Sequence, residues 1–257
     1  MGENHRYPWY DSGWLHNYVN AKAIIQAAKP DALVSFVEAF RVLRTRPDFK
    51  IQQFDRILDI DTIDEVRRVA AALRPTDLEM HELRSFGRFV AHDNPFFSEL
   101  QRKMVPAISE AVGEPVEASY NFLSLYRAPL GVCQVHMDAP NAKWTLDICL
   151  NQSAAWPIYF SQVQPWPEFD NGIRPGDDWE TQIKTSLEFA RYALEPGQAV
   201  VFSGSSQWHY RDPLPSASGR KFCDLLFFHY IPKGTAELVR PRNWARLFDI
   251  PELSQVS

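Results

Sequence analysis

The feature that most constrains the fold of this chain is a change of pattern at Pro115. Before it, apolar residues recur at spacings of three and four over residues 14–28 and 32–43, which predicts helices. A further helix is expected over residues 95–112, where Gly113 suits a C-terminal cap. After Pro115, short β-rich runs alternate with Gly, Pro, Asn and Asp, which is typical of strands joined by turns. The order of these elements predicts an α+β fold.

The β-rich part has the spacing of a sandwich or jelly roll, in which many short antiparallel strands follow one another. We expect one domain over residues 1–257, because no linker-like segment divides the chain, with the helices as a buttress on one sheet. Its parts would be a helical region of about 1–115, a jelly-roll core of about 116–231 and a tail of 232–257. The expected strands are residues 49–58, 116–126, 132–137, 143–150, 157–161, 188–194, 198–203 and 221–231.

Composition excludes several classes of partner. The net charge of −5 and the isoelectric point near 5.8 leave no basic surface for nucleic acid. Neither a run of roughly 20 apolar residues nor an apolar signal core at the N-terminus is present, so we expect no membrane partner and no secretion. The three cysteines lack a CxxC spacing, which favours reduced thiols and a cytoplasmic location. A small-molecule substrate is expected, and the oligomeric state stays open.

Three residues have the spacing of a metal site. On a strand, His136 and Asp138 point to the same side, because residues i and i+2 share a face. His209 follows a later apolar strand. Two imidazoles and one carboxylate are the ligand set of non-haem Fe(II) oxygenases, while zinc hydrolases with such a set typically use a helical HExxH motif, which is absent here. Alone, a His-x-Asp pair is a weak signal that also occurs by chance.

The surroundings of this pair strengthen the signal. Arg220 begins the last strand eleven residues after His209, and a guanidinium binds both oxygens of a carboxylate at once. Tyr126 stands ten residues before His136, in the segment Tyr-Arg-Ala-Pro-Leu-Gly. A strand that ends in Leu-Asn follows the pair, and a Pro-Gly turn precedes the strand before His209.

In this order of motifs, residues 120–231 resemble the Fe(II)/2-oxoglutarate-dependent dioxygenases, in the branch similar to prolyl 4-hydroxylases. The resemblance implies a double-stranded β-helix. It also implies that His136, Asp138 and His209 bind iron, and that Arg220 and Tyr126 bind the distal carboxylate of 2-oxoglutarate. Thr145, on the strand after the His-x-Asp pair, is a candidate for lining the same pocket. The gap from His209 to Arg220 is longer than the resemblance implies, so Lys221 is an alternative to Arg220.

The activity that the resemblance implies is oxidation of a substrate C–H bond with Fe(II), 2-oxoglutarate and O2. Hydroxylation, desaturation and cyclisation all stay open, whereas the carboxylate of Asp138 disfavours halogenation. A small molecule is the expected substrate. The same chemistry on a protein side chain is one alternative, and a non-catalytic β-sandwich binding module is another.

A loop over residues 162–182 is long enough to suggest a function. Its Trp166 and Trp179 suggest an apolar lid over the site, with Gly172 and Gly176 as hinges. Its acidic residues suggest that a substrate with an amine is favoured. These acids are Glu168, Asp170, Asp177, Asp178 and Glu180.

Overall fold

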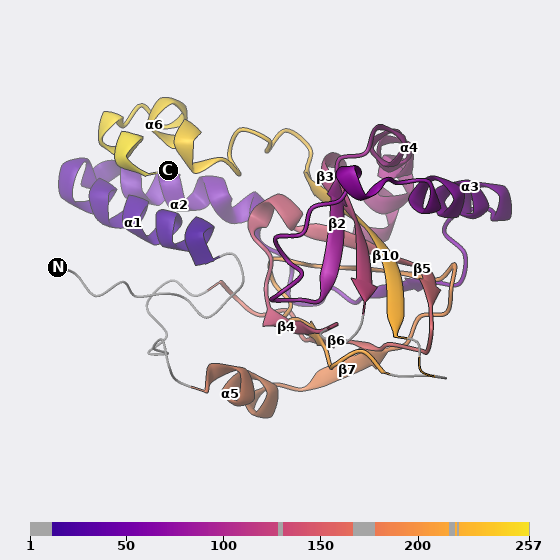
Figure 1. The fold of residues 1–257 in the computed structure, drawn as a ribbon. Helices are drawn as coiled ribbons and strands as arrows, with labels where there is room; N and C mark the ends of the chain where they lie inside the picture. Colours follow the sequence, from indigo (N-terminus) through magenta and orange to yellow (C-terminus); the bar gives the residue numbers. More distant parts are fainter. Residues whose placement is uncertain (1–11, 128–130, 167–177, 216–218, 220, 257) are drawn as a thin grey trace.

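Two antiparallel sheets form the centre of the molecule (Figure 1). The computed structural model of the protein describes residues 12–127, 131–166, 178–215, 219 and 221–256. The larger sheet has the strand order β1-β8-β5-β10-β3-β2 and the smaller one the order β4-β9-β6-β7. With helices before the strands and two sheets face to face, the α+β jelly-roll prediction is confirmed.

Two short strands escaped the sequence analysis. β2 has five residues and β9 has three, too few for an alternating pattern to stand out. The strands of the larger sheet are β1 (Gln52–Phe54), β2 (Arg88–His92), β3 (Val116–Arg127), β5 (Trp144–Gln152), β8 (Ala199–Phe202) and β10 (Phe222–Pro232). Those of the smaller sheet are β4 (Cys133–His136), β6 (Ile158–Ser161), β7 (Phe189–Tyr192) and β9 (His209–Arg211).

Strand β10 is buried on both faces, which explains its nearly continuous apolar sequence. Leu226 and Phe228 belong to the apolar cluster between the larger sheet and two helices. Leu225 and Phe227 alternate with them and belong to the cluster between the two sheets. Because successive side chains point to opposite faces, a strand that fills two cores cannot show a polar side. The face toward the smaller sheet also carries the candidate site.

The helices divide into two groups. Helices α3 (Ile60–Ala71) and α4 (Pro95–Val112) cover the outer face of the larger sheet, as the buttress prediction requires (Figure 1). Gly113 ends α4 with a φ of 73°, the left-handed conformation expected of a glycine C-cap. The first helices, α1 (Ser12–Ala28) and α2 (Leu33–Ala39), instead pack against the C-terminal segment.

Aromatic side chains join the first helices to the C-terminal segment. Trp14 packs edge-on against Trp244 with ring centroids 5.5 Å apart, and its Nε1 donates to the carbonyl of Val239 at 2.9 Å. Helices α1 and α2 therefore bury the C-terminal tail together with residues of the strands, among them Val135 of β4 and Ile231 of β10. The remaining helical segments are α5 (Trp179–Ser186), α6 (Trp244–Leu247) and the 3-10 helices Pro30–Ala32, Phe40–Leu43, Pro75–Asp77, Pro140–Ala142, Pro241–Asn243 and Pro251–Gln255.

The predicted loop over residues 162–182 is only partly a loop. It ends in α5, where Asp178 accepts a hydrogen bond from the Thr181 backbone as the N-cap. Trp166 is only 4% exposed, and its Nε1 donates to the carbonyl of Ser205, so it is a core residue and not a cover for a pocket. Residues 167–177, which include the two proposed hinge glycines, lie outside the described residues.

No helix in the described part of the chain is long and apolar enough to cross a membrane.

A buried ion pair ties three parts of the fold together. The Nζ of Lys143 donates to Glu114 Oε1 at 2.6 Å and to the carbonyl of Val42 at 2.9 Å. Trp144 Nε1 donates to the same carboxylate oxygen at 2.5 Å. Lys143 itself is 2% exposed. The pair therefore joins the α4–β3 turn, the second 3-10 helix and the start of β5.

We predict that Glu114→Ala lowers the free energy of unfolding by about 2 kcal/mol. Breaking a fully buried pair costs about 3–5 kcal/mol, because one charge is left uncompensated, and the partial exposure of Glu114 reduces that cost. Chemical denaturation measures the change. Glu110→Ala, on the exposed side of α4, is the control and should change the value by less than about 0.5 kcal/mol. Equal effects of the two variants would mean that the pair adds nothing to stability.

Candidate metal centre

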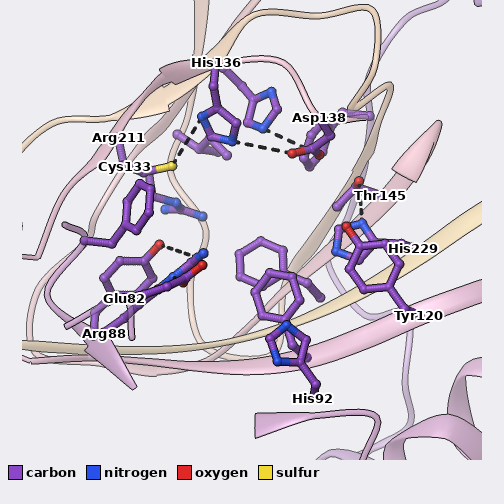
Figure 2. Close-up of a pocket in the computed structure, with 17 residues that line it drawn as sticks. Glu82, Arg88, His92, Tyr120, Cys133, His136, Asp138, Thr145, Arg211 and His229 are labelled. Carbon is purple, nitrogen blue, oxygen red and sulfur yellow. Dashed lines mark hydrogen bonds and ion pairs between the residues drawn. The ribbon is translucent and has the colours of Figure 1, made fainter. Parts of the chain in front are cut away.

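The three residues with metal-ligand spacing meet between the smaller-sheet strands β4 and β9. His136 ends β4 and pairs directly with His209, the first residue of β9. Asp138 follows β4 and faces both rings (Figure 2). Its Oδ1 lies 3.5 Å from His136 Nε2 and its Oδ2 lies 3.8 Å from His209 Nε2. One ligand atom from each residue lies within 4.8 Å of the others, so one ion can be bound by all three.

Backbone carbonyls orient both imidazoles. The Nδ1 of His136 lies 2.7 Å from the carbonyl of Gln134, and the Nδ1 of His209 lies 2.9 Å from the carbonyl of Gln207. A carbonyl can only accept, so each Nδ1 carries a proton and each Nε2 is the atom that faces Asp138. This is the orientation that a metal ligand requires.

The protonation states favour a cation. Burial opposes ionisation of Asp138, but the facing His209 and His136 imidazoles lower the pKa of its carboxyl below the usual range. Burial, together with the neighbouring His136, lowers the pKa of the His209 imidazole to about 4. Burial lowers the pKa of the His136 imidazole, but the neighbouring Cys133 and Asp138 outweigh burial and raise it to about 10. At neutral pH the site therefore offers an anionic carboxylate and a neutral His209 ring, and a metal ion would bind His136 by displacing the proton of its Nε2.

Gly204 holds the segment that carries Asp138. The backbone N–H of Asp138 donates to the carbonyl of Gly204 at 2.8 Å, and the N–H of Gly204 donates to the carbonyl of Lys143 at 3.1 Å. A Cβ at position 204 would lie 2.4 Å from Asp138 Oδ2 and 2.5 Å from the carbonyl of Ala142. Only glycine therefore lets the turn after β8 approach this carboxylate.

A cavity of about 140 Å³ extends from the three residues into the space between the sheets. Its inner part is closed by buried side chains, among them Ile158 and Phe202. Tyr120 and His92 also line it, and both are partly exposed, so the opening lies on their side. The cavity thus has the candidate ligands, a closed end and a mouth.

Two buried arginines line the cavity, each paired with a carboxylate. Arg211 Nη2 lies 2.5 Å from Asp147 Oδ2, and its Nη1 donates to the Trp156 carbonyl. Arg88 pairs with Glu82 through Nε and donates from Nη1 to the Tyr126 hydroxyl at 3.0 Å. The sequence analysis missed both arginines. Arg211 stands two residues after His209, so the i, i+2 rule could have found it, whereas Arg88 lies on the unpredicted strand β2.

The residues predicted to bind a co-substrate have different places. Tyr126 is 1% exposed and lines the cavity, and Thr145 lines it near Asp138. Arg220 lies outside the described residues, and Lys221 is not among the described residues that line the cavity. His229, to which the sequence analysis assigned no role, also lines it. Its Nδ1 lies 3.0 Å from Thr145 Oγ1.

The fold of this chain is similar to solved structures, whereas its sequence matches neither a family model nor a curated protein. Among solved structures, the non-haem alpha-ketoglutarate-dependent carbocyclase SnoK from nogalamycin biosynthesis is similar with a TM-score of 0.55 and 12% identity, covering 78% of this chain and 88% of that one. The epimerase SnoN from the same biosynthesis has a TM-score of 0.52 and 15% identity, covering 83% and 90%.

A third similar structure is EctD from S. alaskensis with 2-oxoglutarate and 5-hydroxyectoine, with a TM-score of 0.52 and 11% identity. It covers 71% of this chain and 72% of that chain. At these identities the likeness concerns the fold. The chain has the fold of the Fe(II)/2-oxoglutarate oxygenases, with a His-x-Asp and a distant His together at one end of the space between its sheets.

Proposed function

We propose that this protein is an Fe(II)- and 2-oxoglutarate-dependent oxygenase that oxidises a C–H bond of a small molecule. The observation that carries the proposal is the meeting of His136, Asp138 and His209 in a cavity of the oxygenase fold. Two imidazoles and a carboxylate leave positions open on Fe(II) for a co-substrate and O2. The likeness to SnoK, SnoN and EctD supports the same reading.

The donor set fits iron. When bound, Fe(II) with 2-oxoglutarate and O2 supplies the oxidising chemistry, and the chain supplies the ligands and the closed cavity. Nitrogen and carboxylate donors of this set suit iron, and the protonation states described above leave Asp138 and His209 able to bind it. Hydroxylation, desaturation and cyclisation all remain compatible with these residues.

Arg88 and Tyr126 are the best-placed groups for the distal carboxylate of 2-oxoglutarate. Burial raises the pKa of the Tyr126 phenol above its ordinary value, so its hydroxyl stays protonated and can donate. Both cavity arginines already pair with a carboxylate, Arg88 with Glu82 and Arg211 with Asp147. Arg88 is favoured because it also bonds the Tyr126 hydroxyl, whereas Arg211 bonds the Trp156 carbonyl. Thr145 lies closer to the metal ligands. Arg220, the receptor predicted from the sequence, is the competing candidate.

A small-molecule substrate fits the cavity better than a protein side chain. The lining residues are mostly buried, so the cavity admits a small molecule more readily than an extended polypeptide. Three other parts of the proposal rest on sequence patterns alone. They are the prolyl 4-hydroxylase-like branch, the cytosolic location and a single domain over residues 1–257. The acids of residues 162–182 suggest an amine-bearing substrate, but Asp178 serves as a helix cap, and neither Asp178 nor Glu180 is among the described residues that line the cavity.

We predict that His136→Ala and His209→Ala abolish both stoichiometric Fe(II) binding and succinate formation from 2-oxoglutarate, because a set of three ligands has no spare member. Anaerobic iron reconstitution followed by metal analysis and a succinate assay measures both. His81→Ala, an exposed histidine outside the cavity, is the control and should keep both. An unchanged iron content in either ligand variant would remove the metal assignment and favour a non-catalytic binding module.

We predict that Gly204→Ala lowers Fe(II) affinity at least tenfold while the protein stays folded. The added methyl group would displace the Asp138 carboxylate from its present position. Metal titration with circular dichroism on the same samples measures binding and folding together. Ser205→Ala, which removes a neighbouring hydroxyl without adding bulk, is the control. If Gly204→Ala binds iron as well as Ser205→Ala does, the close approach has no role in the site.

We predict that Arg88→Lys weakens 2-oxoglutarate binding roughly tenfold, about 1.4 kcal/mol, because lysine keeps the charge and loses the fork. Calorimetric titration of the metal-loaded protein measures the affinity. Arg127→Lys is the control, since that guanidinium pairs with Asp224 outside the cavity. Arg220→Ala is the competing variant. Weakening by this variant, without weakening by Arg88→Lys, would make the sequence prediction right and the assignment to Arg88 wrong.

A further inference from the structure

A second polar group faces the cavity on the mouth side of the metal ligands. His229 is 3% exposed and lines the cavity, and its Nε2 is buried without a hydrogen-bond partner among the described residues. Its other nitrogen, Nδ1, is fixed by Thr145 Oγ1 at 3.0 Å. A buried polar atom without a partner costs free energy, and native proteins rarely keep one without a reason.

An irregularity in the pairing of β10 with β3 lies at this ring. The pairing of β10 with β3 shifts register between Phe228 and Tyr230, where two residues of β3, Ser119 and Tyr120, stand opposite His229 in a β-bulge. Bulges leave backbone groups unpaired and re-aim a side chain, and they are frequent beside active sites. The buried Gln101 of α4 takes over the unpaired groups, since its Nε2 donates to the carbonyls of His229 at 2.7 Å and Tyr120 at 2.8 Å.

Aromatic rings continue the surface on which His229 lies. Tyr120 stacks on His229 with centroids 4.2 Å apart, and Phe122 stacks on Phe227 at 4.8 Å. We name Tyr120, Phe122, Phe227 and His229 the aromatic wall. Figure 2 shows Tyr120 and His229 with Thr145 on the Asp138 side of the cavity, away from Arg88, Glu82 and Arg211.

The wall carries no charge of its own. The lining carboxylate Glu82 is paired with Arg88, Arg211 is paired with Asp147, and Asp138 belongs to the metal site. A charged group placed on the wall would lose water without gaining a counter-ion. An uncharged ring would gain stacking contacts and could pair the free nitrogen through one polar atom.

We propose that the aromatic wall is the substrate-binding surface and takes an uncharged cyclic molecule whose hydroxyl or carbonyl group pairs with His229 Nε2. The inference rests on the proposed function for its link to oxidation, but the wall exists without metal. The 2-oxoglutarate carboxylate would then occupy the closed end near Arg88, and the substrate would enter at the mouth. His229 is a binding residue, and Thr145 and Gln101 position it.

Three probes of equal ring size test the charge preference: cyclohexanol, cyclohexylammonium and cyclohexanecarboxylate. Ligand-observed NMR on the protein loaded with Zn(II) and 2-oxoglutarate, which prevents turnover, measures their affinities. We expect cyclohexanol to bind at least tenfold more tightly than either charged probe. Equal binding of the three, tighter binding of a charged one, or no binding of any would overturn the proposal.

His229→Phe tests the nitrogen, because it keeps a ring and removes both polar atoms. We expect cyclohexanol affinity to fall at least tenfold, 2-oxoglutarate affinity to change less than threefold, and the melting temperature to fall by no more than about 3 °C. A large drop in melting temperature with parallel losses of both ligands would give His229 a structural role only. A loss confined to 2-oxoglutarate would assign the nitrogen to the co-substrate.

Two further variants keep the test decisive. Thr145→Val leaves the ring in place and removes the hydroxyl that fixes it, so cyclohexanol affinity should fall severalfold; no change would contradict the positioning role. His81→Phe, outside the cavity, is the matched control and should change nothing. Repeating the cyclohexanol titration without metal separates this inference from the proposed function. If cyclohexanol binds to a protein that takes up no iron, the aromatic wall is a binding surface and the oxygenase proposal is wrong.

Discussion

The contact between the turn after β8 and the segment after β4 fixes the candidate site. Gly204 accepts from the Asp138 backbone, and the adjacent Ser203 shares a hydrogen bond of 2.7 Å with Thr45, which follows the N-terminal helices. Gln207 closes the turn by accepting from the Ser203 backbone and donating to Ser161 of β6. One turn therefore connects the helices, the smaller sheet and the metal ligands. A change in any of these parts reaches Asp138 through it.

Strand β10 couples packing to the site in a similar way. Its outward side chains fill the core under α3 and α4, and its inward ones line the space between the sheets. Opposite His229 the neighbouring strand β3 bulges, and α4 supplies Gln101 to satisfy the carbonyls of Tyr120 and His229 there. The buttress helix thus has two roles, since it buries apolar surface and also holds the residue that faces the cavity mouth.

Local patterns predicted part of this arrangement. The helix ending at Gly113, most strands and the spacing of His136 with Asp138 depend on periodicity within one element, which a sequence shows directly. Arg88 could not be found in this way, since β2 is short and reaches the site only through pairing with β3. The core position of Trp166 could not be predicted either, because Trp14, against which it packs, is far away in the sequence. Contacts between distant segments are set by the packing of whole elements, which no local pattern records.

Three buried polar atoms lie on the strands that form the middle of the larger sheet, and one of them, His229 Nε2, belongs to a residue that lines the cavity. Ser124 Oγ, Asp147 Oδ1 and His229 Nε2 all lack a hydrogen-bond partner among the described residues, and they stand on three adjacent strands of the larger sheet. Each such atom costs about 1–3 kcal/mol. Apolar side chains at the same positions would give a more stable sheet, as they do at Leu225 and Phe227. The sheet loses stability by keeping His229 Nε2 unpaired beside the cavity, and a ligand that pairs this nitrogen recovers part of that free energy on binding.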